Sequence, residues 1–329
     1  MNKLYLILIF ALIYTNLAWS QWSSSSSVDS TSTSTEIDGV RYMFGLSSNG
    51  SRHIAFQYNF TSQYAKASYI NLRSNILGLL SCDSSSMSIV HQNGTGIIVK
   101  SIVDYNSLQL TDVAKIYVGS YDISPQNFGY DPISNKAYFP ILSSTSLQVW
   151  SLDFTQSSTS LIPLYSNIVK KGQSANFVPK GVYDPTTSRY YVLFASNNVY
   201  YLGIYNTKNK NTSNNVIMFL PATLQGDIIV INSKLYVLFN DNVSITMYIV
   251  DPTKNMSKKV AVFDNSQSEG YTGNYFAVSS NRIVLFTNVN GQLNTATFIV
   301  YDPSTGLFDE FFGWDEMGAF SHVDQICVN

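Results

Sequence analysis

The sequence predicts an all-β protein built from repeated four-stranded units. Strand-like segments recur at steps of 41 to 53 residues, and aromatic residues make up 14% of the chain. Tyr and Phe suit the half-buried surface of a pleated sheet. No segment shows a sustained apolar period of 3.6 residues, which a long amphipathic helix requires. Repeats of this length, rich in β-formers, are typical of arrays in which neighbouring units pack on one another.

Each unit is marked by two polar residues. One opens a strand, and the other closes the next strand 17 to 20 residues later. Polar residues at strand ends can bond exposed backbone groups, so we interpret the recurrence as architecture and not as a binding site. The six pairs are Arg52/Asn71, Thr95/Asp112, Lys136/Asp153, Arg189/Asn206, Lys234/Asp251 and Arg282/Asp302.

The second and third strands of each unit are the clearest. The second is an aromatic and β-branched run, as in 189–194 and 234–239, and the third ends on Asp or Asn. Tight turns join the first strand to the second. In two units the turn contains Tyr-Asp-Pro, at 130–132 and 183–185, where Pro presets φ and Asp bonds its own backbone.

Six such units predict a six-bladed β-propeller. Seven blades are the alternative, because the first strand of the first unit is poorly defined. Radial repetition of small sheets leaves only short, protected edges. The segment 322–328 reads as a single strand without its own unit, and we expect it beside the first unit, where it closes the ring.

The Tyr-Asp-Pro turns are similar to those of several propeller repeats. The chain resembles the broad class of β-propeller repeat proteins at the level of fold, over residues 38–329. This resemblance implies a fold and no particular family or activity.

The amino terminus reads as a secretory signal peptide over residues 1–20. Lys3 precedes an apolar run, and Ala18 and Ser20 are the small residues that a signal peptidase needs. Residues 21–37 are a Ser/Thr-rich leader that cannot bury enough apolar surface to order itself. We therefore expect a secreted protein whose propeller domain spans residues 38–329.

The net charge of −2 and the low charged fraction of 12% indicate no basic face, so we expect no nucleic-acid partner. No later stretch approaches ~20 apolar residues, so we expect no membrane span. We also expect a disulfide between the only two cysteines, Cys82 and Cys327, in an oxidising compartment.

Asn-x-Ser/Thr sequons predict N-glycosylation. Four of them, at Asn49, Asn93, Asn211 and Asn255, are predicted to lie on one face, so we expect partners to use the opposite face. All six are Asn49, Asn59, Asn93, Asn211, Asn242 and Asn255.

Motifs for zinc hydrolysis, nucleophilic serine and phosphate binding are absent, so we predict no catalytic residue, metal or cofactor. The favoured function is an extracellular binding or recognition protein for a protein or glycan. The alternative is a secreted hydrolase or lyase acting on glycan or ester, with carboxylates or a metal at the channel mouth. The candidate contact residues lie in long connecting segments: Asp122, Lys170, Lys171, Glu269, Tyr271, Asp315 and Glu316.

Overall fold

The computed structural model describes most of the chain beyond residue 41. The predicted signal peptide and leader lie outside the described residues. The described ranges are 42–49, 52–59, 64–72, 76–94, 96–119, 128–142, 145–166, 179–196, 199–219, 225–240, 244–264, 274–279, 282–288, 295–314 and 322–328.

The described strands form six antiparallel sheets of four strands each. From the inner to the outer strand, the sheets are β24 (His322–Val328), β1 (Tyr42–Asn49), β2 (Arg52–Asn59) and β3 (Tyr64–Ile70); β4 (Ile76–Cys82), β5 (Ser86–Gln92), β6 (Ile97–Asp104) and β7 (Leu110–Tyr117); β8 (Gly129–Asp131), β9 (Lys136–Leu142), β10 (Ser146–Asp153) and β11 (Ser158–Ser166); β12 (Lys180–Asp184), β13 (Arg189–Ser196), β14 (Val199–Asn206) and β15 (Thr212–Phe219); β16 (Gln225–Ile231), β17 (Lys234–Asn240), β18 (Ser244–Asp251) and β19 (Met256–Asp264); and β20 (Asn274–Ser279), β21 (Arg282–Asn288), β22 (Thr295–Tyr301) and β23 (Phe308–Trp314).

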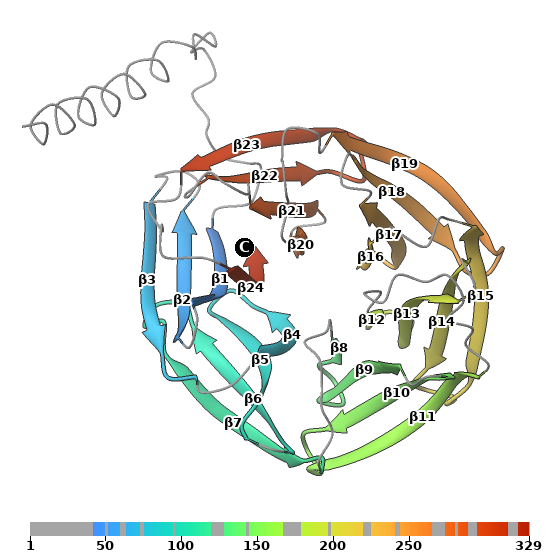
Figure 1. Ribbon diagram of the computed structural model, residues 1–329, viewed down its shortest axis with the longest axis horizontal. Coiled ribbons are helices and arrows are strands. Elements are labelled where there is room, and N and C mark those ends of the chain that lie inside the picture. Colours follow the sequence, from blue (N-terminus) through green and yellow to red (C-terminus); the bar gives the residue numbers. More distant parts are fainter. Residues whose placement is uncertain are drawn as a thin grey trace, which may run out of the picture. The chain divides into compact units, whose positions relative to one another are not determined.

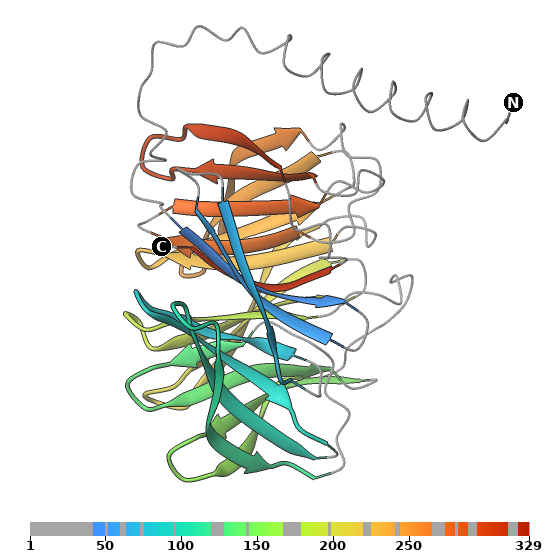
Figure 2. The same ribbon diagram turned by 90° about the vertical axis from the view of Figure 1, so that its left-hand side faces the viewer.

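The sheets follow one another around a ring, as Figure 1 shows, with β4, β8, β12, β16, β20 and β24 nearest the centre. Seen from the side, the strands run between two faces where the connections lie (Figure 2). This is the arrangement of a β-propeller, so the predicted fold-level resemblance is confirmed.

The predicted division into six complete, contiguous units is wrong. Only five sheets are contiguous in sequence, and the remaining sheet combines β1, β2 and β3 with β24 from the other end of the chain. β24 pairs with β1, with Phe44 opposite Cys327, and it supplies the inner strand that this sheet otherwise lacks. The described strands form no seventh sheet, so the seven-bladed alternative is wrong as well.

The strand register of the first two units also needs correction. Because β24 supplies the inner strand of the composite sheet, the chain enters that sheet at its second strand. The pair that spans the second and third strands is therefore Tyr42/Asn59 in place of Arg52/Asn71. In the next sheet it is Ser86/Asp104 in place of Thr95/Asp112, and Cys82 is the last residue of the inner strand β4.

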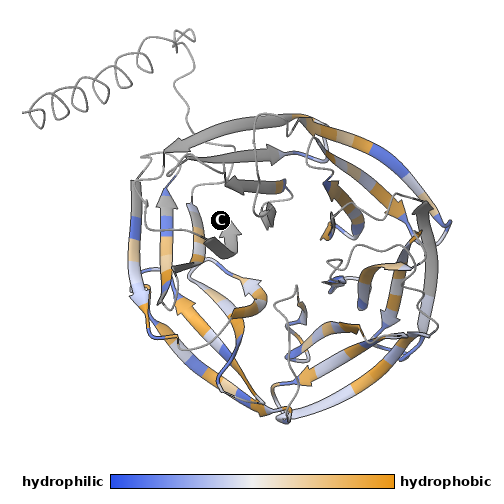
Figure 3. Cartoon of the chain, viewed as in Figure 1, coloured by the Kyte–Doolittle hydropathy of each residue, from blue (hydrophilic) through white to orange (hydrophobic). Residues whose placement is uncertain are grey.

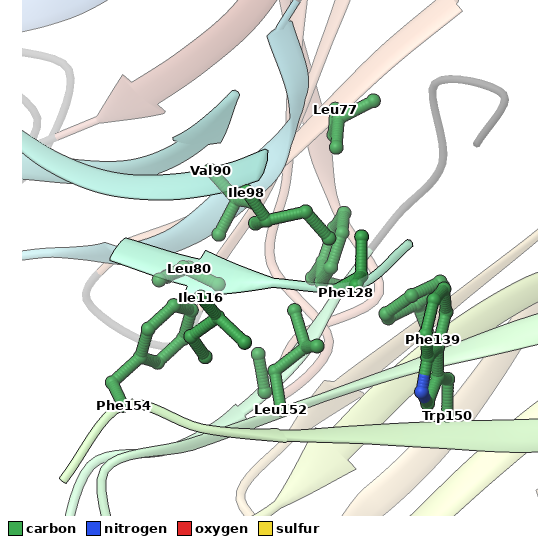
Figure 4. Close-up of a cluster of buried hydrophobic side chains, with 12 residues drawn as sticks. Leu77, Leu80, Val90, Ile98, Ile116, Phe128, Phe139, Trp150, Leu152 and Phe154 are labelled. Carbon is green, nitrogen blue, oxygen red and sulfur yellow. The ribbon is translucent and has the colours of Figure 1, made fainter. Parts of the chain in front are cut away.

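Apolar side chains pack between neighbouring sheets. The strands carry many apolar residues (Figure 3), and in second strands such as β13 and β17 successive residues are buried, because a neighbouring sheet covers each face. Between the second and third sheets, Phe139 and Trp150 lie with ring centroids 5.2 Å apart, and Leu77 and Leu152 are fully buried (Figure 4). Each sheet therefore depends on its neighbours for its core.

One turn recurs around the ring. An Asp or Asn lies at the last position of a strand or directly after it, and its side-chain oxygen accepts the amide two residues later. The residue four positions on has a positive φ between 50° and 75°. The side chain thus satisfies a turn amide that lacks a ladder partner. The seven turns begin at Asp104, Asp131, Asp153, Asp184, Asn206, Asp251 and Asp302.

These turns join first to second or third to fourth strands, so they lie at the same end of their sheets. We call this side of the ring the turn face. The sequons divide between both faces. Asn49 and Asn93 lie at or just after the end of second strands, whereas Asn59, Asn211 and Asn255 lie at or just after the end of third strands. The prediction that Asn49 and Asn93 share a face with Asn211 and Asn255 is wrong. The sequons therefore no longer indicate which face of the ring binds partners.

Asn242 lies outside the described residues. Cys82 is disulfide-bonded in the structure, and Cys327 in β24 is the only other cysteine of the chain. The disulfide between Cys82 and Cys327 stays a prediction for the protein in solution, which non-reducing peptide mapping would test. Among the described residues, no helix is long and apolar enough to cross a membrane.

Candidate functional site

A groove of about 490 Å³ opens on the turn face where the fourth and fifth sheets meet. Its walls are the start of β13, the β16–β17 turn and the β18–β19 turn. Each wall is built by a tight turn: Ser188 has a φ of 55° just before β13, and Asn232 and Ser233, with φ values of 49° and 59°, form the two-residue turn before β17. The groove is thus made of the same local structures that recur around the ring.

Four cations line this groove, with one carboxylate. The cations are Arg189, Lys234, Lys254 and Lys258, and the carboxylate is Asp251. The chain as a whole carries a net charge of −2, whereas the residues that line the groove are mainly positively charged. Such a concentration of one charge favours a ligand of the opposite charge.

Asp251 compensates little of this positive charge. A hydrogen bond from the Thr253 hydroxyl, and further bonds from turn amides, lower the pKa of Asp251, so it stays ionised. Its nearest cation is Lys254, at 3.4 Å, and both side chains are exposed, so their attraction is weak. Within the described part of the chain, Arg189, Lys234 and Lys258 form no ion pair.

The equivalent cations in other sheets are paired. In the third sheet, Lys136 Nζ lies 3.1 Å from Asp153 Oδ2, and in the last sheet Arg282 Nε lies 3.9 Å from Asp302 Oδ2. In the fourth sheet, the residue opposite Arg189 is the neutral Asn206. The repeat therefore leaves Arg189 without an opposing carboxylate at the groove.

The recurring turns of the fourth and fifth sheets also differ from the other turns in their charge. Lys occurs within these seven turns only in the fourth and fifth sheets, at Lys208 and Lys210 after Asn206 and at Lys254 after Asp251. Lys208 and Lys210 are exposed. The turn geometry does not need lysine, because the other turns have Ser, Thr, Pro, Asn, Gln, Gly or apolar residues in these places. The cations therefore extend from the groove along the turn face of the fourth and fifth sheets.

Hydroxyl groups accompany the cations. Thr187, Ser233, Thr253 and Ser257 all line the groove. A hydroxyl can both donate and accept a hydrogen bond, which matches the hydroxyls of a sugar. Cations and hydroxyls together fit a ligand that combines acid groups with hydroxyl groups.

The sequence did not predict this groove. All seven candidate contact residues, namely Asp122, Lys170, Lys171, Glu269, Tyr271, Asp315 and Glu316, lie outside the described residues. The sequence pattern assigns Arg189 and Lys234 to the architecture of the repeat, together with their counterparts Lys136 and Arg282. The available signal was the Asn at position 206, where four of the other closing residues are Asp.

A second polar cluster is structural. His91 Nε2 lies 2.9 Å from Ser101 Oγ, and Ser101 Oγ donates to Asp112 Oδ1 at 2.8 Å. Burial lowers the pKa of His91, although Asp112 opposes this effect. Ser101 is fully buried and gives its proton to the carboxylate, so it has neither the exposure nor the orientation of a nucleophile.

The groove holds a single carboxylate, whereas the hydrolase alternative predicts carboxylates or a metal at the channel mouth. Glycoside hydrolysis ordinarily uses two carboxyl groups on either side of the scissile bond. Asp251 is the only carboxylate among the lining residues, and it accepts turn hydrogen bonds from Thr253 and Lys254. The carboxylate of the groove therefore serves the turn in which it lies.

No known family matches the chain, and no curated protein matches its sequence. Solved structures resemble it in fold. TolB from Acinetobacter baumannii has a TM-score of 0.57 at 10% identity, over 88% of this chain and 66% of that one, so this chain spans less than two thirds of TolB. A chain of a nidogen/laminin complex has a TM-score of 0.52 at 13% identity, over 88% and 98%. A putative 6-phosphogluconolactonase from Bacteroides uniformis has a TM-score of 0.53 at 12% identity, over 84% and 83%. These similarities define the class as β-propeller proteins, which include both binding proteins and enzymes.

Proposed function

We propose that this protein is an extracellular recognition protein that binds an acidic glycan in the groove between its fourth and fifth sheets. The observation that carries the proposal is the set of uncompensated cations, Arg189, Lys234 and Lys258, on the groove walls. The sequence-predicted signal peptide supports the extracellular location.

A glycan fits better than an acidic peptide. A peptide that binds an extended surface commonly adds a strand to a free sheet edge. The groove walls are turns and strand ends, and the strands behind them, such as β17 and β18, already pair on both sides. A sugar acid needs charge and hydroxyl partners instead, and the groove supplies both.

Binding assays with polyanions test the proposal. The full-length secreted protein is measured against heparin as a sulfated glycan, polygalacturonate as a carboxylated glycan, polyglutamate as an acidic peptide and dextran as a neutral glycan. We expect binding to at least one acidic glycan and none to dextran. Binding should weaken as the salt concentration rises from about 50 to about 500 mM, because salt screens the attraction between the cations and the ligand and shortens the Debye length to below ~10 Å.

Matched variants locate the binding to the groove. Arg189→Ser with Lys234→Ser should weaken the binding about tenfold, which corresponds to ~1.4 kcal/mol. Lys136→Ser with Lys115→Ser makes the same change in net charge on other sheets, and should leave the affinity within about twofold. Equal losses in both double variants would show that net charge alone attracts the ligand, and preferential binding of polyglutamate would overturn the assignment to a glycan.

A further inference from the structure

We propose that Asn255 carries an N-linked glycan on the rim of the groove, and that this glycan excludes long polyanions while it admits short ones. This inference rests on the proposed function of the groove. It assigns a size limit to that site, which follows from the position of one sequon.

Asn255 lies within the groove wall without lining the groove. The sequon Asn255-Met256-Ser257 spans the turn between β18 and β19. Seven residues of the segment 251–258 line the groove, and Asn255 is the exception. Its side chain is exposed. A glycan attached there begins at the rim and does not fill the groove itself.

The backbone keeps this residue at the tip of the turn. Asn255 has a φ of 53°, the left-handed conformation that recurs at this position of all seven turns. Asn tolerates this conformation better than most residues. The attachment point therefore has a fixed position between Lys254 and Met256, which both line the groove.

A glycan at this position has a steric consequence. N-linked glycans are bulky and hydrated, so they obstruct contacts near their attachment point. A polyanion that is longer than the groove has to extend past its rim, where Asn255 lies between the lining residues Lys254 and Met256. A di- or trisaccharide needs only the groove. The glycan therefore selects ligands by length and leaves the charge of the groove unchanged.

The neighbouring sequon provides a matched control. Asn211 is also exposed, it follows the equivalent turn of the fourth sheet, and it does not line the groove. Its amide donates to the Asn209 side chain, and its carbonyl accepts the amide of Asn206. Asn211→Gln removes this sequon and keeps both backbone bonds.

The experiment uses Asn255→Gly in the full-length protein, secreted from cells that attach N-linked glycans. Gly is the natural residue at the same turn position after Asp302, where Gly306 has a φ of 75°, so the variant keeps its turn. Peptide mapping first measures glycan occupancy at position 255. Binding is then measured to heparin chains of increasing length, from disaccharide to full polymer. Endoglycosidase treatment that leaves one sugar provides a second comparison without a change in sequence.

We expect occupancy at Asn255, and about tenfold tighter binding of long heparin by Asn255→Gly and by the trimmed protein than by the untreated protein. Affinity for the disaccharide should change less than about twofold, and Asn211→Gln should behave as the unchanged protein. An unoccupied Asn255, or equal affinities for long chains with and without the glycan, would overturn the inference while the groove still binds. Failure of Asn255→Gly to bind any acidic glycan would overturn the proposed function and the inference with it.

Discussion

The third and fourth sheets share the same turn but differ in whether the cation beside it is paired with a carboxylate. Lys136 opens a strand of the third sheet and is paired with Asp153 at 3.1 Å. Arg189 opens the equivalent strand of the fourth sheet and faces Asn206 across the ladder. Both closing residues accept the same turn amides, so the turn is preserved while the charge is not. In a repeat protein, a site can therefore arise by removing one charge from a structural pair.

The largest effect that follows from this comparison is on binding. Arg189→Glu with Lys234→Glu reverses two charges at the groove, and should weaken binding of an acidic glycan about a hundredfold, or ~2.7 kcal/mol. Isothermal titration at low salt measures this loss. The same reversal at Lys136 and Lys115 is the control, and a comparable loss there would remove the distinction between the two sheets.

A smaller effect comes from giving the fourth sheet the third sheet's carboxylate. Asn206→Asp places an acid opposite Arg189 and keeps the oxygen that accepts the amides of Lys208 and Asn209. Competition by this carboxylate should weaken glycan binding about fivefold, or ~1 kcal/mol, with little change in stability. Unchanged binding in a folded variant would show that Arg189 does not contact the ligand.

The reciprocal change should affect stability instead of binding. Asp153→Asn keeps the turn acceptor but removes the partner of Lys136, and should lower the free energy of unfolding at pH 7 by about 1 kcal/mol. Urea unfolding measures this difference, and glycan binding should be unchanged. A gain of glycan binding at the third sheet would mean that an unpaired cation suffices without the groove.

The effect of Asp153→Asn on the free energy of unfolding should also depend on pH. Partial burial disfavours ionisation of Asp153, but hydrogen bonds from the Gln156 amide, Lys136 and the Thr155 amide outweigh it and lower the pKa below its ordinary value of 3.8. A lowered pKa in the folded state adds stability above that value, and this contribution is lost as the pH falls through the folded pKa. The stability difference between the unchanged protein and Asp153→Asn should therefore narrow below about pH 4. A difference that stays constant from pH 7 to pH 3 would contradict this assignment.

The repeat could be predicted from the sequence because its signals are local. Tyr-Asp-Pro turns, aromatic strands and closing Asp residues each depend on a few neighbouring residues. The strand register in the first two sheets could not, because it depends on β24, which is more than 270 residues away in sequence from β1. The pair Arg52/Asn71 fits the local pattern as well as Tyr42/Asn59 does.

The groove shows a second limit of sequence reasoning. Arg189 and Lys234 are identical in type and position to cations that are structural elsewhere. Whether such a cation is paired depends on side-chain geometry: Asp251 lies within reach of Lys254 and forms no ion pair with Lys234. The sequence shows Asn206 where most other units have Asp. Only the structure shows that this Asn faces Arg189 at a groove, whereas Asp153 pairs with Lys136 in the third sheet.

The composite sheet has a consequence for synthesis of the chain. β1 emerges from the ribosome with one edge unpaired, and the strand that covers this edge, β24, is the last of the described strands to be made. At ~5–20 residues per second, the wait lasts roughly 15–60 s. During this time the edge of β1 can pair with other nascent chains, so we expect the amino-terminal strands to depend on chaperones more than the five contiguous sheets do. A premature stop shortly before His322 would leave these five sheets intact and still expose this edge permanently.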